Sequence, residues 1–142
     1  MKIAVASDHA AFHEKDAVAQ FLRDLGHDVT DFGTNGPASV DYPDFARPAA
    51  QAVGRGDCDR AVFICGTGLG VMYAANRVHG VRAALLANPF LAEMSRRHND
   101  ANGACLGARW QDMETMKSLL TIWLDTPFEG GRHGGRVAKL DC

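Results

Sequence analysis

Short apolar runs alternate along the chain with segments that are apolar on one face only. The runs predict strands at residues 2–7, 28–32, 60–65, 82–86 and 104–106. The segments between them predict helices at 11–25, 43–53, 71–76, 89–97 and 112–124, with Gly26 ending the first and Pro43 opening the second. Alternating strands and helices are typical of a parallel sheet covered by helices on both faces.

In such a sheet the carboxyl ends of the strands share one edge, and ligands bind along it. Three polar segments are expected there: Asp8-His9 after the first strand, residues 66–70 after the third, and residues 98–100 leading towards the fifth. The sequence therefore predicts one α/β domain over residues 1–142, in which residues 127–142 form a glycine-rich basic C-terminal segment.

Composition excludes several classes of protein. With 46% hydrophobic and 23% charged residues, the 142-residue chain is not intrinsically disordered. A formal net charge of −2 gives no sign of a nucleic-acid or membrane surface. No two of the four cysteines are spaced Cys-x-x-Cys, and the first apolar run is too short for a signal peptide or a membrane span. We expect a cytoplasmic protein with reduced thiols.

The loop Cys65-Gly-Thr-Gly-Leu-Gly carries the strongest chemical signal. A glycine-rich turn that opens a helix presents backbone N–H groups that suit an anion, although a plain tight turn stays an alternative. The loop is not a P-loop, because no Gly-Lys-Ser/Thr follows, and it is not a dinucleotide fingerprint, because Val71 stands where the third glycine belongs. Cys65 is either a small buried hydrophobe or a thiolate, favoured by the helix N-terminus, that acts as a base.

Other polar segments allow a structural or a functional interpretation. Asp8 is a helix N-cap or a site residue, and residues 96–102 are a polar turn or part of a binding site. Arg132 and Arg136 share a face and clamp a phosphate if their segment is helical, and otherwise belong to a flexible basic tail. We expect the remaining Lys and Arg side chains to be solvated, and no chemistry from three of the cysteines: Cys58, Cys105 and Cys142.

Metal binding has little support in the sequence. No set of His, Asp and Glu residues shows a helical ligand spacing such as His-x-x-x-His. We therefore predict no metal site.

Taken together, these segments resemble the type B ribose-5-phosphate isomerases, a family that also includes allose-6-phosphate and galactose-6-phosphate isomerase subunits. Six short motifs match in family order and are far more specific together than singly. They are Ser7-Asp8-His9-Ala10, Asp41-Tyr42-Pro43-Asp44, residues 65–70, Asn76 with residues 80–84, residues 98–102 with 106–109, and residues 130–133 with Arg136.

The resemblance implies a fold, an assembly and a reaction. The fold is a Rossmann-like three-layer α/β/α sandwich with a five-stranded parallel sheet, and the assembly is a homodimer or a dimer of dimers with shared active sites. The reaction interconverts D-ribose 5-phosphate and D-ribulose 5-phosphate, in the pentose phosphate pathway, through ring opening and an enediolate. It requires no cofactor.

The resemblance also implies a role for each site residue. Cys65 would move the proton between C1 and C2, with the enediolate oxygens held by the loop around Thr67: Gly66, Gly68, Leu69 and Gly70. His98 would help to open the furanose ring, with Asp8 at the ring oxygens. His9, Arg132 and Arg136 would bind the phosphate. Tyr42, Asn99 and Arg109 would line the site, and His98, Asn99 and Arg109 are expected from the partner subunit.

Two other functions stay open. One is the same chemistry on another sugar phosphate, such as allose 6-phosphate, galactose 6-phosphate or a tetrose phosphate. The other is a non-catalytic, flavodoxin-like module that binds a phosphorylated ligand. One departure from the family pattern concerns the C-terminal segment, where Gly134 and Gly135 favour flexibility just before Arg136.

Overall fold

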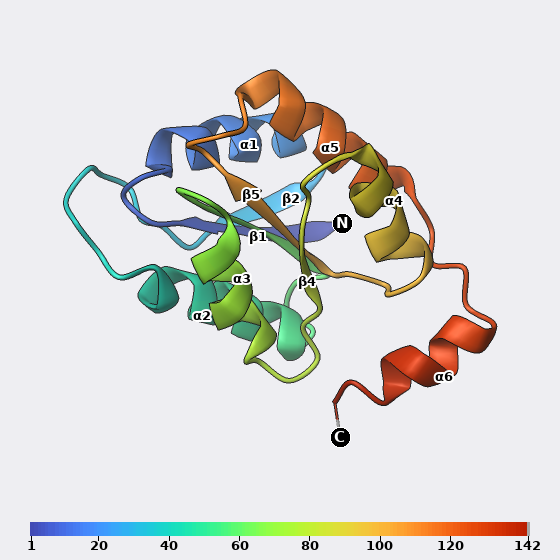
Figure 1. Cartoon of the computed structure of the whole chain (residues 1–142). Helices are drawn as coiled ribbons and strands as arrows, with labels where there is room; N and C mark the ends of the chain where they lie inside the picture. The colour runs from blue at the N-terminus through green and yellow to red at the C-terminus, as the bar shows by residue number, and fades with distance from the viewer. Residues whose placement is uncertain (142) are drawn as a thin grey trace.

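A five-stranded, all-parallel sheet lies between two layers of helices in the computed structural model, which describes residues 1–141 (Figure 1). The strands are β1 (Lys2–Ser7), β2 (Asp28–Asp31), β3 (Arg60–Cys65), β4 (Ala83–Leu85) and β5 (Gly103–Gly107). The helices are α1 (Phe12–Asp24), α2 (Tyr42–Gly54), α3 (Leu69–Asn76), α4 (Pro89–Arg97), α5 (Met113–Asp125) and α6 (Arg132–Ala138). The predicted three-layer fold is confirmed.

The order of the strands is β2-β1-β3-β5-β4, so β1 and β3 are neighbours, with Ser7 opposite Ile64. The chain leaves β1 through α1 towards β2 on one side, and leaves β3 through α3 towards β4 on the other. This reversal is a topological switch point, and open α/β sheets bind ligands in the crevice outside the carboxyl ends of such strands. The crevice at the ends of β1 and β3 is therefore the favoured position for a site.

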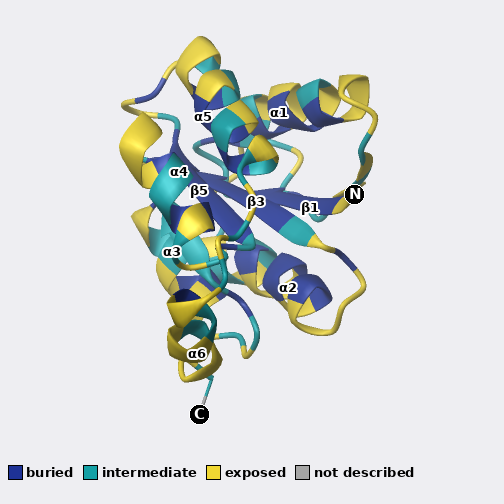
Figure 2. Ribbon diagram, turned by 90° about the vertical axis from the view of Figure 1, so that its right-hand side faces the viewer, coloured by how far each residue is buried: buried dark blue, intermediate teal, exposed yellow. Residues whose placement is uncertain are grey.

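The two faces of the sheet have different cores. Helices α1, α4 and α5 cover one face with large side chains such as Leu22 and Trp123. Helices α2 and α3 cover the other face with many alanines, among them Ala49, Ala50 and Ala75. Small side chains let these helices lie close to the sheet, and Figure 2 shows the strands buried between helices whose outer faces are exposed.

Two basic side chains are buried, and for Lys15 this is contrary to the expectation that it lies in solvent. Lys15 is fully buried, and its Nζ donates hydrogen bonds to Asp16 at 2.8 Å, Asp31 at 2.6 Å and Asn35 at 3.1 Å. Arg96 is 6% exposed, and it donates to Asp100 Oδ1 and to a backbone carbonyl. The prediction failed for Lys15 because Asp31 and Asn35 come from other parts of the chain, which the periodicity of one helix does not reveal.

The C-terminal segment contains a helix rather than a flexible tail. Arg132 and Arg136 lie one turn apart in α6, and His133 is buried on the side that faces the body of the protein. The end of the segment is also held, because Asp141 Oδ1 accepts a hydrogen bond from the Gly80 N–H at 3.2 Å. Cys142 lies outside the described residues.

Among residues 1–141, no helix is both long and apolar enough to span a bilayer.

Candidate active site

Cys65 is the last residue of β3 and is 5% exposed. Its Sγ accepts a hydrogen bond from the Gly68 N–H, at a distance of 3.1 Å. A charged acceptor gains more from an N–H donor than a neutral one does, so this bond suits a thiolate. The thiol therefore lies against the loop that the sequence predicts to hold an anion.

The glycines of this loop, residues 66–70, are required by close approach. Gly68 has a φ of +86°, and a Cβ there would lie 2.7 Å from Leu85 Cδ1. A Cβ at Gly70 would lie 2.8 Å from Cζ of Tyr42, because the tyrosine ring rests on this part of the loop. Thr67 is exposed, and its Oγ1 accepts a hydrogen bond from the Leu69 N–H at 3.2 Å. A side chain is therefore excluded at Gly68 and at Gly70, where the loop has backbone groups only.

Arg109 lies over the same loop. A Cβ at Gly66 would be 3.1 Å from the Arg109 guanidinium carbon, and the Arg109 N–H donates to the Gly66 carbonyl at 2.9 Å. Within one chain, therefore, the residue after β5 reaches the end of the neighbouring strand β3, whereas the resemblance implies that Arg109 comes from a partner subunit. Trp110, which the sequence analysis missed, lies beside it and donates from Nε1 to the Thr67 carbonyl at 2.9 Å.

Asp8 and His9 complete this edge of the sheet. The Asp8 N–H donates to the Ile64 carbonyl at 3.4 Å, so the end of β1 adjoins the end of β3. The N-cap of α1 is Ala11 and not Asp8, whose carboxylate accepts instead from the Ala10 N–H at 2.9 Å. His9 Nδ1 accepts from the Val40 N–H at 3.1 Å, so a neutral His9 carries its proton on Nε2 and has a donor there.

Residues 98–100 lie at the opposite edge, where the strands begin. The expectation that they join the carboxyl edge is wrong, because they lead into β5 rather than out of it. Two side chains of this motif shape the loop: Asn102 Oδ1 accepts from the Arg82 N–H at 2.7 Å, and Asp100 accepts from Arg96 at 2.7 Å. His98 is partly exposed and Asn99 is exposed.

His98 belongs to a second group of polar side chains, which includes part of α6. Its ring stacks on that of His133, with centroids 4.3 Å apart and an angle of 13° between the planes. Burial, followed by the charges of His98 and Arg132, lowers the pKa of His133. Glu129 lies 4.0 Å from His98 and 3.7 Å from His133. The argument from spacing missed this cluster because His98 comes from a distant segment.

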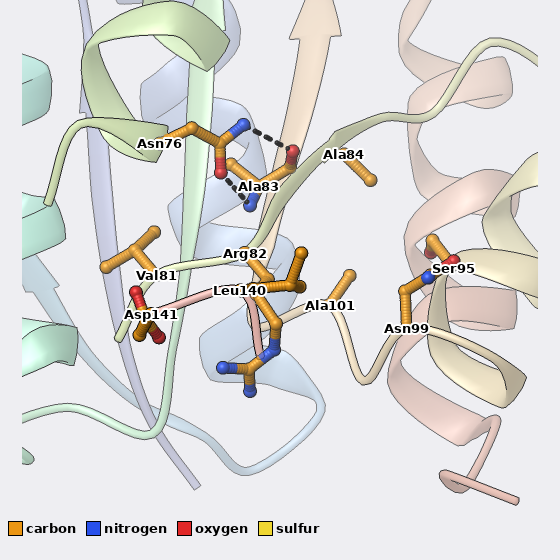
Figure 3. Close-up of a pocket in the computed structure, with 10 residues that line it drawn as sticks. All are labelled: Asn76, Val81, Arg82, Ala83, Ala84, Ser95, Asn99, Ala101, Leu140 and Asp141. Atoms are coloured by element: carbon orange, nitrogen blue, oxygen red, sulfur yellow. Dashed lines mark hydrogen bonds between the residues drawn. The ribbon is translucent and has the colours of Figure 1, made fainter. Parts of the chain in front are cut away.

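A pocket of about 430 Å³ also lies at the amino edge (Figure 3). Its lining includes Asn99, together with Arg82, Leu140 and Asp141. Asn76 exchanges two hydrogen bonds with the backbone of Ala83, at 2.9 and 2.8 Å, and so fixes the start of β4 (Figure 3). Asn76, which belongs to the family motif, therefore has a structural role in the wall of the pocket.

The candidate site residues thus form two groups within one chain. The carboxyl-edge group consists of Asp8, His9, Tyr42, Cys65, residues 66–70 and Arg109. The amino-edge group consists of His98, Asn99, Arg132 and Arg136. Figure 1 draws α6 at the lower right, on the side where β3 and β5 begin, whereas the loop before α3 lies at the other end of β3.

Comparisons with known proteins agree with the resemblance read from the motifs. A family model described as Ribose/Galactose Isomerase matches residues 3–140. Ribose-5-phosphate isomerase B of Escherichia coli (strain K12) is 40% identical over 98% of this chain and 93% of its own length. D-erythrulose-4-phosphate isomerase of Pectobacterium atrosepticum is 36% identical over 99% and 93%. The solved structure of Clostridium thermocellum Ribose-5-Phosphate Isomerase B has a TM-score of 0.97 and 49% identity, covering 99% and 95% of the two chains. The chain belongs to the Ribose/Galactose Isomerase family.

Proposed function

We propose that this protein is an aldose–ketose isomerase that interconverts D-ribose 5-phosphate and D-ribulose 5-phosphate through an open-chain enediolate. The names of the relatives from Escherichia coli and Clostridium thermocellum support this substrate. The observation that carries the proposal is the Cys65 sulfur at the end of β3, which accepts a hydrogen bond from an N–H of the glycine loop. A base beside a set of backbone donors is what proton transfer next to a carbonyl requires.

The proton transfer uses the carboxyl-edge group. Cys65 as a thiolate takes the proton from C2 of the open-chain aldose, and the electron pair of that bond forms the C1–C2 double bond while the carbonyl oxygen becomes an oxyanion. Backbone N–H groups of residues 66–70 stabilise this enediolate, with Thr67 beside it. A proton passes from the C2 hydroxyl to O1, the thiol returns its proton to C1, and the electron pair left on O2 forms the C2 carbonyl, which gives the ketose.

Ring opening and phosphate binding use the amino-edge group of residues together with several residues of the carboxyl-edge group. Opening the furanose moves a proton from the anomeric hydroxyl to the ring oxygen, and we assign this transfer to His98, with Asp8 at the ring oxygens. Arg132 and Arg136 lie one turn apart on α6, so both guanidinium groups can bind one phosphate. His9 adds a donor at Nε2, and Asn99, Tyr42 and Arg109 line the site.

We further propose a homodimer in which the two groups of each site come from different chains. Within one chain, the amino-edge group lies at the opposite edge of the sheet from Cys65. In the proposed dimer, the amino-edge group of the second chain lies beside Cys65 of the first. Exposed apolar side chains beside the glycine loop support a partner surface: Leu69 is 38% exposed, Tyr73 57% and Trp110 50%.

We place the reaction in the cytoplasm, since the cysteines at 58, 65 and 105 are free thiols, as a reducing compartment maintains.

A second candidate substrate is a tetrose phosphate. The relative from Pectobacterium atrosepticum supports it by its name, D-erythrulose-4-phosphate isomerase. The chemistry at Cys65 is the same for a shorter sugar.

A coupled assay over four-, five- and six-carbon aldose phosphates, run with excess chelator, tests the proposal. We expect the highest kcat/KM for ribose 5-phosphate. A higher value for the four-carbon sugar would select the second candidate, and no turnover of any sugar phosphate by the folded protein would contradict the isomerase assignment. The Cys65→Ala variant, purified in the same way, controls for contaminating isomerase from the host.

A further inference from the structure

Three potential metal ligands meet at the amino edge, and the proposed reaction uses one of them. His98 follows the last residue of α4, Glu129 precedes α6, and His133 lies in the first turn of α6. One ligand atom from each residue lies within 4.8 Å of the others. The proposed mechanism gives His98 a role in ring opening and gives none to Glu129 or His133.

A second observation points to a ligand at this cluster. The His133 side chain is 7% exposed, and its Nε2 is buried without a hydrogen-bond partner within the part of the chain that the structure describes. This nitrogen faces the Glu129 carboxylate at 3.7 Å, which is beyond hydrogen-bond distance. A buried ring nitrogen left unpaired is unfavourable, and a cation between the two groups gives both a partner.

The spacing of the groups fits a small cation. Ligands about 2.1 Å from a tetrahedral Zn²⁺ are about 3.4 Å from one another. The carboxylate oxygens lie 3.7 Å from the His133 nitrogen and 4.0 Å from the His98 nitrogen. All three ligand atoms lie within 4.8 Å of one another, so reaching this spacing takes an approach of up to about 1.4 Å and a turn of the His98 ring out of its stack on His133. The side chains of Glu129 and His98 are 47% and 41% exposed and free to make these movements.

We propose that His98, Glu129 and His133 bind a divalent transition-metal cation of the zinc class, with a water at the fourth position. Two imidazoles and one carboxylate favour Zn²⁺, Ni²⁺ or Cu²⁺ over Mg²⁺, which prefers oxygen ligands. Arg132 and Arg136 on the same helix repel a cation, and a phosphorylated sugar bound by them competes for the same space. Bound metal therefore inhibits the isomerase by occupying His98, a consequence that rests on the proposed function.

Isothermal titration of the full-length protein with ZnCl₂, after treatment with chelator, measures the binding without reference to activity. We expect one site per chain, with Glu129→Gln and His133→Gln each weakening binding by more than about tenfold. His79→Gln is the matched control, because His79 also lies near a carboxylate, 3.6 Å from Asp141, but is 82% exposed and outside the cluster. Cys65→Ser tests whether the thiol binds the metal instead.

The site is overturned if Glu129→Gln and His133→Gln bind Zn²⁺ as wild type does, if Cys65→Ser loses the binding, or if Mg²⁺ binds as tightly as Zn²⁺. Glu129 is exposed, so Glu129→Gln decides the matter even if His133→Gln does not fold. The activity assay adds a separate outcome. Zn²⁺ should inhibit the isomerase, chelator should reverse the inhibition, and the apparent KM for the sugar phosphate should rise with the Zn²⁺ concentration. Binding in a protein that isomerises no sugar phosphate would leave the site standing and refute the proposed function.

Discussion

The two edges of the sheet hold polar groups that are built in different ways. At the carboxyl edge, Cys65 ends a strand that is buried in the centre of the sheet, and the chain after β5 bonds to the loop through Ala108 and Arg109, both at 2.9 Å. At the amino edge, His98 and Arg132 belong to the end of α4 and to α6. Among the described residues of α6, His133 alone is buried.

This difference separates the proton transfer between C2 and C1 from ring opening and phosphate binding. The sheet itself fixes the sulfur and the backbone donors, so substitutions at the carboxyl edge act on the proton transfer or on the whole fold. The amino-edge group depends on a short helix docked by few side chains. Substitutions on α6 act on substrate affinity and local stability, those at His98 act on ring opening, and the fold tolerates both.

The largest effect is expected at the carboxyl edge. Cys65→Ala should lower kcat by roughly 10²–10⁴-fold or more, because it removes the base. Cys58→Ala is the matched control, since Cys58 is also buried but lies just before the start of the same strand. Burial and the neighbouring carboxylates raise the pKa of the Cys58 thiol, so it stays protonated. A Cys65→Ala variant with more than about a tenth of wild-type kcat would show that another group is the base.

The second-largest effect is expected at the amino edge, and it falls on KM more than on kcat. Arg132→Ala should raise KM by roughly 10–100-fold with a smaller change in kcat, because a guanidinium on a phosphate that does not react binds ground state and transition state alike. Steady-state kinetics measure both constants, and inorganic phosphate should compete less well in the variant. Arg55→Ala, a change of an exposed arginine paired with Asp57, is the control. An unchanged KM would remove Arg132 from the site.

Two glycine substitutions test the contrast in packing. A Cβ at Gly107, the end of β5, would lie 2.6 Å from the Thr67 carbonyl oxygen and would clash with Trp110, so Gly107→Ala should destabilise the fold by about 1–3 kcal/mol. At Gly134, inside α6, no described atom lies within 4 Å of such a Cβ, so Gly134→Ala should stabilise by about 0.5–1 kcal/mol. Urea denaturation measures both. Equal and small effects would mean that the two edges are packed alike.

The smallest effect concerns pH. Burial, and then the charges of His98 and Arg132, lower the pKa of His133 below its usual 6.5 in the folded state. The unfolded chain therefore binds more protons, and the stabilisation is present above pH 6.5 and is lost as the pH falls from there through the folded pKa. Between about pH 8 and about pH 5, the Tm of wild type should fall further than that of His133→Gln. An equal fall in Tm for wild type and for His133→Gln would contradict the assignment of this pH effect to His133.

The fold could be predicted because its signals are local. Apolar runs mark the buried strands, Gly26 and the prolines mark helix ends, and the predicted bounds differ from the observed ones by at most two residues. Helix α6 could not be predicted in this way, since Gly134 and Gly135 disfavour a helix in isolation and the docking of His133 stabilises it. The burial of Lys15 was hidden for the same reason, because its partners Asp31 and Asn35 lie in other segments.

The candidate site was predicted unevenly. Cys65 and its loop stand out because strand, thiol and glycines are contiguous in the sequence. The edge occupied by His98 was predicted wrongly, since a polar segment before a strand looks the same as one after it. Glu129 and His133 were missed because their position beside His98 depends on how the C-terminal segment packs. The roles of the site residues came from the family resemblance and not from spacing.

Subunit mixing tests the central claim, that each active site combines the carboxyl edge of one chain with the amino edge of another. Cys65→Ala and His98→Asn, each nearly inactive, are mixed and allowed to exchange subunits, which mass spectrometry verifies. About half of the dimers become mixed, and each mixed dimer carries one intact site. The account predicts recovery to about a quarter of wild-type activity if the sites act independently.

The matched control is a mixture of Cys65→Ala with Arg109→Ala. Both residues belong to the carboxyl edge of the same chain, so every site in a mixed dimer carries one defect, and the account predicts no gain over the two variants alone. Recovery in the first mixture and none in the second is the predicted result. No recovery in the first mixture despite complete exchange would place Cys65 and His98 in one chain's site and contradict the account.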